Sequence, residues 1–412
     1  MISVFTPLSA TGNPFIREAY ESLLAQSRSD WEWVVLENNG GELPSDISSD
    51  RRVRRIEHDG VNGIGALKRR CCKFSKGDVL VEFDHDDVLR PDALELVCSE
   101  MNVGADFVYS DFCEFRTTEK GYEANLYGGD AGWECYTTEF RGRPIDASRA
   151  PAATPQNLRR ILWAPNHVRA WRRDFYEKVG GHDEKLPVAD DHDLVVRSFL
   201  AGGKIAHVPE CLYFYRVHEN QTTNFSQKNQ LIQEKAEETY QKHILALAEK
   251  FATDAGLTKV DLCGGINGRP GYTHLDLSLG VNLDEKWPLE DSSVGVITAF
   301  DAIEHLRSPV HTMNEAYRVL APGGFFISLT PSTDGRGAFQ DPTHVSFWNE
   351  NSFWYYTRRE LRQYVRAIEC RFQVSSLRTM FPSEWQRRHN IPYVEAHLIA
   401  LKDGYKPMGT IS

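Results

Sequence analysis

Short apolar runs alternate with amphipathic segments along the first half of the sequence, and this alternation restricts the fold more than any other feature. The apolar runs cover residues 2–5, 33–36, 79–83 and 107–109, and the amphipathic segments between them cover residues 14–27, 63–75 and 91–101. Strands that alternate with helices form a mostly parallel sheet that helices cover on both faces. Ligands of such sheets bind beyond the carboxyl ends of the strands. Thr6, Glu37 and Asp84 lie at or just after expected strand ends, so we expect them to meet in one crevice.

A second alternation of this kind follows a long charged segment. Residues 226–255 have helical periodicity and contain neither glycine nor proline, which predicts one connecting helix. Further apolar runs then cover residues 259–263, 272–277, 294–299 and 325–329. We therefore predict an α/β protein with a first domain over residues 1–225, a connecting helix over 226–255 and a second domain over 256–412.

Composition narrows the functional classes. The formal net charge of −11 argues against broad nucleic-acid binding, which depends on basic surface. The sequence has no apolar run of about 18 residues, so no membrane span is expected, and its first residues, MISVFTPLSATG, are typical of a strand rather than a secretion signal. The eight cysteines form no CxxC pair, which argues against a zinc framework and a disulfide scaffold. We expect a cytoplasmic protein in a reducing environment.

Residues 117–160 interrupt the alternation. They are rich in glycine, proline, threonine and aromatic residues. A long irregular insertion in a compact domain is usually functional or disordered. The aromatic residues favour an ordered loop that covers a ligand.

The stretch EFDHDDVL (82–89) places Asp84, Asp86 and Asp87 directly after an apolar strand. Acids packed this closely repel one another and resist burial unless a positive charge is bound. Carboxylate oxygens are the ligands that Mg²⁺ and Mn²⁺ prefer, so the stretch predicts a divalent cation site. The alternative is a solvated polar turn in which Asp87 caps the following helix.

Several further stretches occur with this one in a fixed order. They are ISVFTP (2–7), WVVLENNG (33–40), NGIGALK (62–68), KGDVLVEFDHDD (76–87), APNHVRAWRRDFYEKVGGHDE (164–184), ADDHDLVVRSFLAGGKIAHVPE (189–210) and YFYRVHENQTT (213–223). Together they resemble the family 2 glycosyltransferases of the GT-A fold. The resemblance implies a GT-A domain that uses a nucleotide-sugar donor, a glycan acceptor and Mn²⁺ or Mg²⁺.

The resemblance also implies roles for individual residues. Asp84 would face the nucleotide ribose, and Asp86 would bind the metal. His218 would lie near the metal and the diphosphate, although a single histidine is more often structural. The other residues assigned to the nucleotide sugar are Thr6, Pro7, Glu37, Asn38, Lys68, His85 and Asp190. The alternative for Lys68 is an exposed position on a helix.

Asp191 is the expected general base, because Asp190-Asp191 resembles the Glu-Asp pair of the family. A neighbouring acid can raise the pKa of such a base toward the working pH. The alternative is an acidic helix N-terminus stabilised by the helix dipole. With one base and no second carboxylate nucleophile, the resemblance implies single displacement with inversion. Trp133 and Trp163 are candidates to stack on the acceptor sugar, or else belong to the core.

The second half carries a different series of motifs. The stretches are KVDLCGGINGRPGYTHLDL (259–277), EKWPLEDSSVGVITAFDAIEHL (285–306), EAYRVLAPGGFFISLTPS (315–332) and DPTHVSFWNENSFWYYT (341–357). They resemble class I S-adenosylmethionine-dependent methyltransferases, which implies a Rossmann-like domain with that cofactor. A glycine turn lets a ligand approach the backbone, and an acid after the next strand can hold ribose hydroxyls.

Gly264, Gly265, Asp276 and Asp301 are the residues assigned to S-adenosylmethionine, and His305 or His344 would take the proton of the acceptor. Only about six residues separate Gly265 from Tyr272, so no full helix fits there. We expect a bifunctional enzyme whose second domain O-methylates a sugar. The alternative is a glycosyltransferase whose second domain is a non-catalytic docking or acceptor-binding module. The donor sugar, the acceptor and the oligomeric state stay open.

Overall fold

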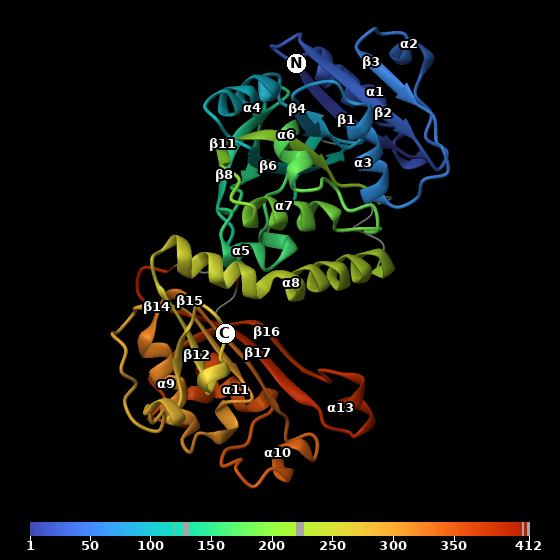
Figure 1. The fold of residues 1–412 in the computed structure, drawn as a ribbon. Helices are drawn as coiled ribbons and strands as arrows, with labels where there is room; N and C mark the ends of the chain where they lie inside the picture. The colour runs from blue at the N-terminus through green and yellow to red at the C-terminus, as the bar shows by residue number, and fades with distance from the viewer. Residues whose placement is uncertain (120, 127–131, 220–225, 406–407, 410–412) are drawn as a thin grey trace. The chain divides into compact units, whose positions relative to one another are not determined.

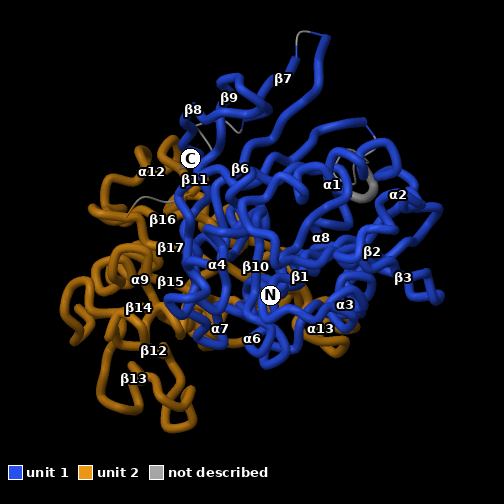
Figure 2. The backbone as a smooth tube through the Cα atoms, turned by 90° about the horizontal axis from the view of Figure 1, so that it is seen from above, with its two compact units in different colours: residues 1–243 blue, residues 244–412 orange. Residues whose placement is uncertain are grey.

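The computed structural model describes residues 1–119, 121–126, 132–219, 226–405 and 408–409. The chain forms two compact units, residues 1–243 and residues 244–412 (Figure 2). Both units combine helices with a mixed sheet, which confirms the predicted α/β class.

The first unit is built on an 11-stranded sheet whose main path runs β3-β2-β1-β4-β10-β6-β11-β5 (Figure 1). The strands β1, β2, β3 and β4 are parallel, whereas β10 runs antiparallel to both of its neighbours. Their bounds are β1 (Ile2–Leu8), β2 (Trp31–Glu37), β3 (Val53–Ile56), β4 (Val79–Glu82), β5 (Val88–Leu89), β6 (Phe107–Thr118), β10 (Arg169–Arg172) and β11 (Ile205–Arg216). Every residue of β1 and β2 is buried, as expected for strands that are covered on both faces.

Amphipathic helices pack against this sheet. Helix α3 packs on β1 and β2, and α4 packs on β6 and β11. The helices of this unit are α1 (Ile16–Leu24), α2 (Ser45–Ser48), α3 (Ile64–Phe74), α4 (Ala93–Asn102), α5 (Pro155–Leu158), α6 (Arg173–Lys178) and α7 (Asp190–Leu200), with 3-10 turns at Ala10–Gly12 and Ile161–Trp163. The amphipathic segments expected over residues 14–27, 63–75 and 91–101 correspond to α1, α3 and α4.

The prediction of an irregular insertion over residues 117–160 is wrong for most of its described part. That part contains β7 (Gly121–Ala124), β8 (Cys135–Phe140) and β9 (Arg143–Ser148), while residues 120 and 127–131 lie outside the described residues. Strands β8 and β9 pair antiparallel with Phe140 opposite Arg143, so a two-residue turn joins them. Both turn residues, Arg141 and Gly142, have positive φ, which is the geometry that tight hairpins need.

The second unit is built on a six-stranded sheet in the order β13-β12-β14-β15-β17-β16. The first four strands of this path are parallel, and β17 runs antiparallel to β15 and β16. The strands are β12 (Thr258–Leu262), β13 (Thr273–Leu275), β14 (Val294–Phe300), β15 (Leu320–Pro331), β16 (Phe372–Met380) and β17 (Tyr393–Ala400). The helices are α9 (Pro309–Val319), α10 (Gly337–Gln340), α11 (Glu350–Thr357), α12 (Arg359–Arg362) and α13 (Glu384–Arg388).

The core of the second unit is apolar and contains two large indole rings. Trp287 and Trp348 are both almost fully buried, together with residues from β12, β14, β15 and β17. Only a 3-10 turn, η5 (Gly265–Asn267), follows β12 before β13 begins. The absence of a full helix at this point was expected from the sequence spacing.

A single helix, α8 (Ser226–Asp254), spans the segment that was predicted as a connecting helix. The division between the two units falls inside α8, after His243. Within the part of the chain that the structure describes, no helix combines the length and the apolar character that crossing a membrane requires.

Candidate functional site

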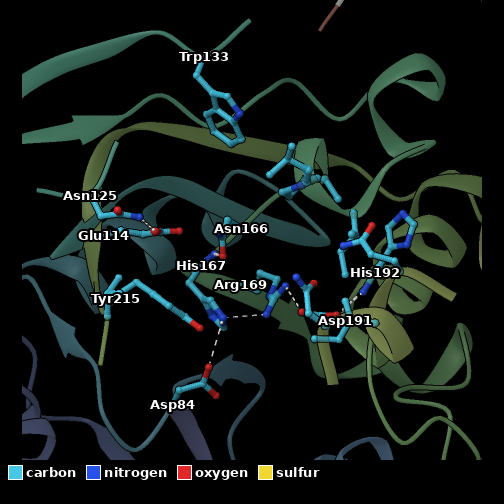
Figure 3. A pocket seen from close by; sticks show the side chains of 18 of the residues that line it. Asp84, Glu114, Asn125, Trp133, Asn166, His167, Arg169, Asp191, His192 and Tyr215 are labelled. Carbon is cyan, nitrogen blue, oxygen red and sulfur yellow. Dashed lines mark hydrogen bonds and ion pairs between the residues drawn. The ribbon is translucent and has the colours of Figure 1, made fainter. Parts of the chain in front are cut away.

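A cavity of about 510 Å³ opens in the first unit (Figure 3). Its wall combines residues from several elements, and charged side chains face one another across it. They include Lys68 of α3, Asp84 after β4, Glu114 and Arg116 of β6, Arg169 of β10 and Asp191 of α7. Asp84 therefore lies at the expected crevice, whereas Thr6 and Glu37 are not among the lining residues.

A chain of polar contacts joins Asp84 to Asp191 across the cavity (Figure 3). Arg169 donates from Nη1 to Asp191 Oδ2 at 2.7 Å and from Nη2 to His167 Nε2 at 2.8 Å. His167 Nε2 in turn lies 3.5 Å from Asp84 Oδ2. Because a guanidinium can only donate, Nε2 of His167 must accept, so the ring is neutral. Burial and the charge of Arg169 accordingly lower the pKa of His167 to about 3.

Lys68 belongs to a buried charge cluster beneath this cavity. Its Nζ lies 2.5 Å from Glu82 Oε1 and 3.5 Å from Asp190 Oδ2. Arg169 also donates to Glu82 Oε1, at 3.1 Å, and His182 Nδ1 lies 2.7 Å from Asp190 Oδ2. Lys68 is only 5% exposed, so the alternative of a solvated helix lysine is wrong. Lys68 acts as a counter-charge for two buried carboxylates and also reaches the cavity wall.

The acidic motif divides into carboxylates with different environments. Burial raises the pKa of Asp84 to about 6, helped by the charges of Glu82 and Asp86 and opposed by Lys68. Burial also disfavours the charge of Asp86, but a 2.9 Å hydrogen bond with His218 Nε2 and the nearby His85 hold its pKa below the ordinary value. The motif therefore presents one carboxylate that stays ionised beside one that resists ionisation.

Asp87 and His85, which flank Asp86 in the sequence, make hydrogen bonds within the protein. The Asp87 carboxylate accepts a 2.7 Å hydrogen bond from the Arg216 backbone N–H and does not cap α4. His85 lies 3.0 Å through Nδ1 from the Pro7 carbonyl, and its ring occupies the space beside Gly12, where an added Cβ would lie 2.2 Å from the ring. The Pro7 backbone thus orients a histidine next to Asp86.

The expectation that a neighbouring acid raises the pKa of Asp191 is wrong. Burial disfavours the charge of Asp191, but Arg169 and Lys68 outweigh it and hold the pKa well below the ordinary value. The Asp191 Oδ1 atom accepts from the N–H of His192 at the start of α7, as the alternative of an acidic helix N-terminus anticipates. Oδ1 bonds the helix while Oδ2 accepts from Arg169 at the cavity wall, so the geometry agrees with the helix N-terminus, and the role as general base stays a prediction.

Three of the residues assigned to the nucleotide sugar are engaged within the protein. The Thr6 hydroxyl donates to the Phe83 carbonyl at 2.6 Å and accepts from Trp33, so it is not available to a ligand. Glu37 accepts from the Leu43 N–H and from Arg55, at 2.7 and 2.8 Å. The Asn38 amide donates to the Leu8 carbonyl at 2.9 Å.

The two candidate tryptophans differ in position. Trp133 lines the cavity and meets Phe112 edge-on at 5.8 Å between ring centroids. Trp163 is not among the lining residues, and its ring packs under the guanidinium of Arg159 at 4.6 Å. His218 lines a second cavity of about 510 Å³, which shares Arg116 and Val217 with the first.

Several cavity residues were missed in the sequence. Arg169 and His167 lie within the stretch APNHVRAW, whose order was noted but whose polar residues were not assigned. Glu114, Asn125 and Tyr215 also line the cavity, and the Asn125 amide donates to Glu114 at 2.7 Å. The sequence did not mark these three as site residues, because Asn125 lies in the segment that was expected to be irregular and Glu114 and Tyr215 lie inside strands.

In the second unit, the glycine turn after β12 is tightly closed. An added Cβ on Gly264 would lie 2.4 Å from Asp261 Oδ2, and Gly265 has φ +54°. Asp276 accepts from the Gly265 N–H at 3.1 Å and from the Ser278 N–H at 2.7 Å. The structure thus brings Gly264, Gly265 and Asp276 together, as predicted.

Asp301, His305 and His344 lie beyond the end of β14 or in the loop that approaches it. Asp301 is exposed at φ +50°, directly after the strand. The rings of His305 and His344 meet edge-on with their centroids 5.0 Å apart. Glu304, which was not assigned a role from the sequence, is buried beside them.

Comparison with known proteins places two families on this chain. A family model described as glycosyl transferase family 2 matches residues 3–147. The chain is 24% identical over 222 residues to the O-antigen biosynthesis protein RfbC of Myxococcus xanthus, which covers 52% of this chain and 16% of that protein. It is also 24% identical over 243 residues to the uncharacterized glycosyltransferase EpsJ of Bacillus subtilis, covering 55% and 64% respectively. The chain thus spans less than two thirds of each relative.

A second family model, described as a methyltransferase domain, matches residues 246–328. A probable S-adenosylmethionine-dependent methyltransferase of Mycolicibacterium smegmatis is 40% identical over 81 residues, which cover 19% of this chain and 31% of that protein. Among solved structures, residues 1–349 of S. aureus TarS in complex with UDP-GlcNAc align with a TM-score of 0.41 and 14% identity. That alignment covers 62% of this chain and 74% of the other.

The buried charge cluster yields a stability prediction. Lys68→Met leaves Glu82 and Asp190 with one cation fewer in the interior, so we expect it to lower the free energy of unfolding by about 3–5 kcal/mol. Lys73→Met lies on the same helix and removes an exposed pair with Glu184, so we expect a change of at most about 1 kcal/mol. Chemical denaturation followed by circular dichroism measures both. Equal stability of the two variants would contradict the structural role of Lys68.

Proposed function

We propose that this chain, in which a family 2 glycosyltransferase domain is joined to a methyltransferase domain, transfers a sugar from a nucleotide-sugar donor to a glycan acceptor and O-methylates a sugar. We assign the first activity to residues 1–225 and the second to residues 256–412. The observation that carries the proposal is the cavity of the first unit, which both Asp84 and Asp191 line. Fold alone would not support an activity.

The donor would occupy the side of the cavity that carries the acidic motif. Asp86 is held ionised, His218 lies against it, and Asp84 resists ionisation, so the motif is suited to a Mn²⁺ or Mg²⁺ ion held by Asp86 and His218. When bound, such an ion neutralises the charge that develops on the departing nucleoside diphosphate. Asp84 would then face the ribose, and Lys68 would add a positive charge at the cavity wall.

The acceptor would approach from the side of Asp191 and Trp133. Asp191 is the one carboxylate of this wall whose pKa is lowered, and Oδ2 faces the cavity beside Arg169. As general base, Asp191 takes the proton of the acceptor hydroxyl while the hydroxyl oxygen attacks the anomeric carbon. The bond to the nucleoside diphosphate breaks in the same step, so the configuration inverts. Arg169 keeps Asp191 ionised and fixes its direction.

The second unit would hold S-adenosylmethionine at the glycine turn. The Gly264–Gly265 turn would allow a close approach, and Asp276, which accepts from the Gly265 N–H, would hold ribose hydroxyls. Asp301 follows the neighbouring strand, where the methyl group would meet its acceptor. Methyl transfer to a hydroxyl also needs a group that makes the oxygen nucleophilic. His305 and His344, whose rings meet edge-on beyond the end of β14, are the candidates for this role.

A second candidate function rests on the short segment between β12 and β13. Without a full helix there, fewer backbone N–H groups face the cofactor than in a long-turn relative. The second unit would then be a docking or acceptor-binding module. Cofactor binding separates the two candidates.

The donor site is tested with Asp86→Asn. We expect metal-dependent release of nucleoside diphosphate from the preferred nucleotide sugar, screened with Mn²⁺, to fall at least about a hundredfold in this variant. Asp92→Asn is the matched control, because Asp92 lies at the surface and pairs with Arg90. Release that is equally fast in Asp86→Asn, or that persists in EDTA, would contradict a metal held by Asp86.

The base is tested with Asp191→Asn. We expect kcat to fall by about 10²–10⁴ while donor affinity stays unchanged, because Asp191 acts on the acceptor. Asp183→Asn serves as control, since the Asp183 carboxylate accepts from the Lys185 N–H nearby and does not line the cavity. A base with a lowered pKa stays ionised as the pH falls, so Asp191 contributes no loss of kcat/KM between about pH 8 and 5. An unchanged kcat in Asp191→Asn would overturn the assignment.

The methyl-donor site is tested by calorimetric titration of the full chain with S-adenosylmethionine. We expect binding by the unsubstituted chain and at least about tenfold weaker binding by Asp276→Ala, because two ribose hydrogen bonds are lost. Asp291→Ala is the control, since Asp291 pairs with Arg318 at the surface. A complete lack of binding by the unsubstituted chain would favour the docking module.

A further inference from the structure

Three side chains of the second unit bring metal-ligating atoms together near the end of β14. Glu304 and His305 belong to the 3-10 turn η7 (Ile303–His305), and His344 lies in the loop between α10 and α11. One ligand atom from each residue lies within 4.8 Å of the others. The backbone carbonyl of Glu304 accepts from the N–H groups of Val345 and Ser346 at 2.9 and 3.0 Å, so the loop of His344 is fixed against η7.

Glu304 directs a buried oxygen into this cluster. The residue is only 2% exposed, and its Oε2 accepts from the Thr330 hydroxyl at 2.6 Å. Among the described residues, none donates a hydrogen bond to Oε1. A buried carboxylate oxygen without a partner costs free energy unless a cation or proton compensates it.

Hydrogen bonds to the backbone set the tautomers of both histidines. His344 Nδ1 lies 3.1 Å from the Ala338 carbonyl. Because a carbonyl only accepts, the proton of this ring is on Nδ1, and Nε2 of the neutral ring carries a lone pair.

His305 is held in the same tautomer by Thr343. Its Nδ1 lies 3.2 Å from both the Thr343 carbonyl and the Thr343 Oγ1. The Thr343 hydroxyl donates its own proton to Asp341 Oδ1 at 2.6 Å, so its oxygen is left to accept from the ring. Metal-ligating histidines are typically oriented in this way, by a carbonyl or carboxylate on the nitrogen that does not bind the ion.

We propose that Glu304, His305 and His344 bind a divalent first-row transition-metal ion, with Zn²⁺ favoured over Mg²⁺. Two imidazoles and one carboxylate form the ligand set of many catalytic zinc sites, which keep a fourth position open. Magnesium prefers oxygen ligands, so a set in which two of the three protein ligands are imidazoles suits it poorly. Four-coordinate zinc holds its ligand atoms roughly 3.4 Å apart, so atoms that lie within 4.8 Å of one another would approach by up to roughly 1.4 Å through rotation of the two half-buried rings.

The ion would lie next to the glycine turn. Cys263, which precedes Gly264, approaches the Ala302 carbonyl with its Sγ at 3.8 Å, and Ala302 precedes η7. An acceptor hydroxyl on the open position would release its proton to water more easily, and its oxygen would bond the methyl carbon as the carbon–sulfur bond breaks and S-adenosylhomocysteine leaves. The two histidines would then act as ligands rather than as proton acceptors. This role rests on the proposed methyl transfer, whereas ion binding itself does not.

Ion binding is tested on the full chain carrying Asp86→Ala, so that the acidic motif of the first unit does not contribute. Equilibrium dialysis against Zn²⁺ with metal analysis gives the stoichiometry, and titration gives the affinity. We expect one tightly bound Zn²⁺ that is lost or bound at least about tenfold more weakly with Glu304→Gln and with His344→Gln. Both substitutions keep hydrogen-bonding capacity, and circular dichroism confirms that each variant folds.

Two further variants sharpen the result. Asp341→Asn leaves all three ligands in place but weakens the contact that orients His305, so we expect about tenfold weaker binding. His389→Gln removes a surface histidine that stacks on Trp385, so we expect the affinity to be unchanged. Co²⁺ in place of Zn²⁺ should give the visible absorption of a four-coordinate site, and this absorption should disappear in His344→Gln.

Unchanged Zn²⁺ affinity in both Glu304→Gln and His344→Gln would overturn the proposal, as would a parent protein that binds no Zn²⁺. A different result would contradict the proposed methyl transfer. A protein that binds Zn²⁺ at these residues but does not bind S-adenosylmethionine would retain the ion site and contradict the methyltransferase activity.

Discussion

Two buried cations, Lys68 and Arg169, join the elements of the first unit that form the wall of its cavity. Both approach the same oxygen of Glu82, which is 1% exposed at the end of β4. Lys68 comes from α3 and Arg169 from β10, so one carboxylate fixes a helix and an antiparallel strand onto the parallel strands. Burying such charges costs desolvation that their attraction barely offsets. The arrangement therefore does more to fix the positions of α3 and β10 than to stabilise the fold. Both elements contribute residues to the cavity wall.

The same cations separate the two carboxylates that face the cavity. Asp191 is held ionised because Arg169 and Lys68 outweigh its burial. Asp84 receives less compensation, since Glu82 and Asp86 repel it, and its pKa rises to about 6. Pairs of acids whose environments push their pKa values apart are typical of sites with distinct chemical roles. Here the carboxylate with the lowered pKa lies on α7 beside Arg169, and the other belongs to the acidic motif.

The sequence predicted the layout of the molecule well, but not the partners of its polar side chains. Apolar runs were enough to locate β1, β2, β4 and β6 in the first unit and β12, β13, β14 and β15 in the second. Helical periodicity located α1, α3, α4 and the long helix α8, because burial sets these patterns. The antiparallel strands β8 and β9 were missed, since their turn depends on Arg141 adopting positive φ, which composition does not reveal. Asp84 and Asp191 were found by motif, whereas Arg169 was not, because an arginine within a strand is visible as a site residue only once the sheet is assembled. The lowered pKa of Asp191 has the same origin: its neighbour in sequence is an acid, but its neighbours in space are cations.

Each unit contains a buried glutamate, and the two glutamates have different neighbours. Glu82 has two cations within 3.1 Å, and its pKa is lowered by Arg169 and Lys68 against the effect of burial. Glu304 is equally buried, yet no lysine or arginine among the described residues pairs with it, and burial raises its pKa despite the Thr330 hydrogen bond. His305 and His344 lie beside Glu304, each with its Nδ1 against a backbone carbonyl. In the ion site that we propose, both rings and the carboxylate would ligate one cation. Lysine and arginine side chains thus compensate the buried Glu82 in the first unit, whereas we propose that a bound ion compensates Glu304 in the second.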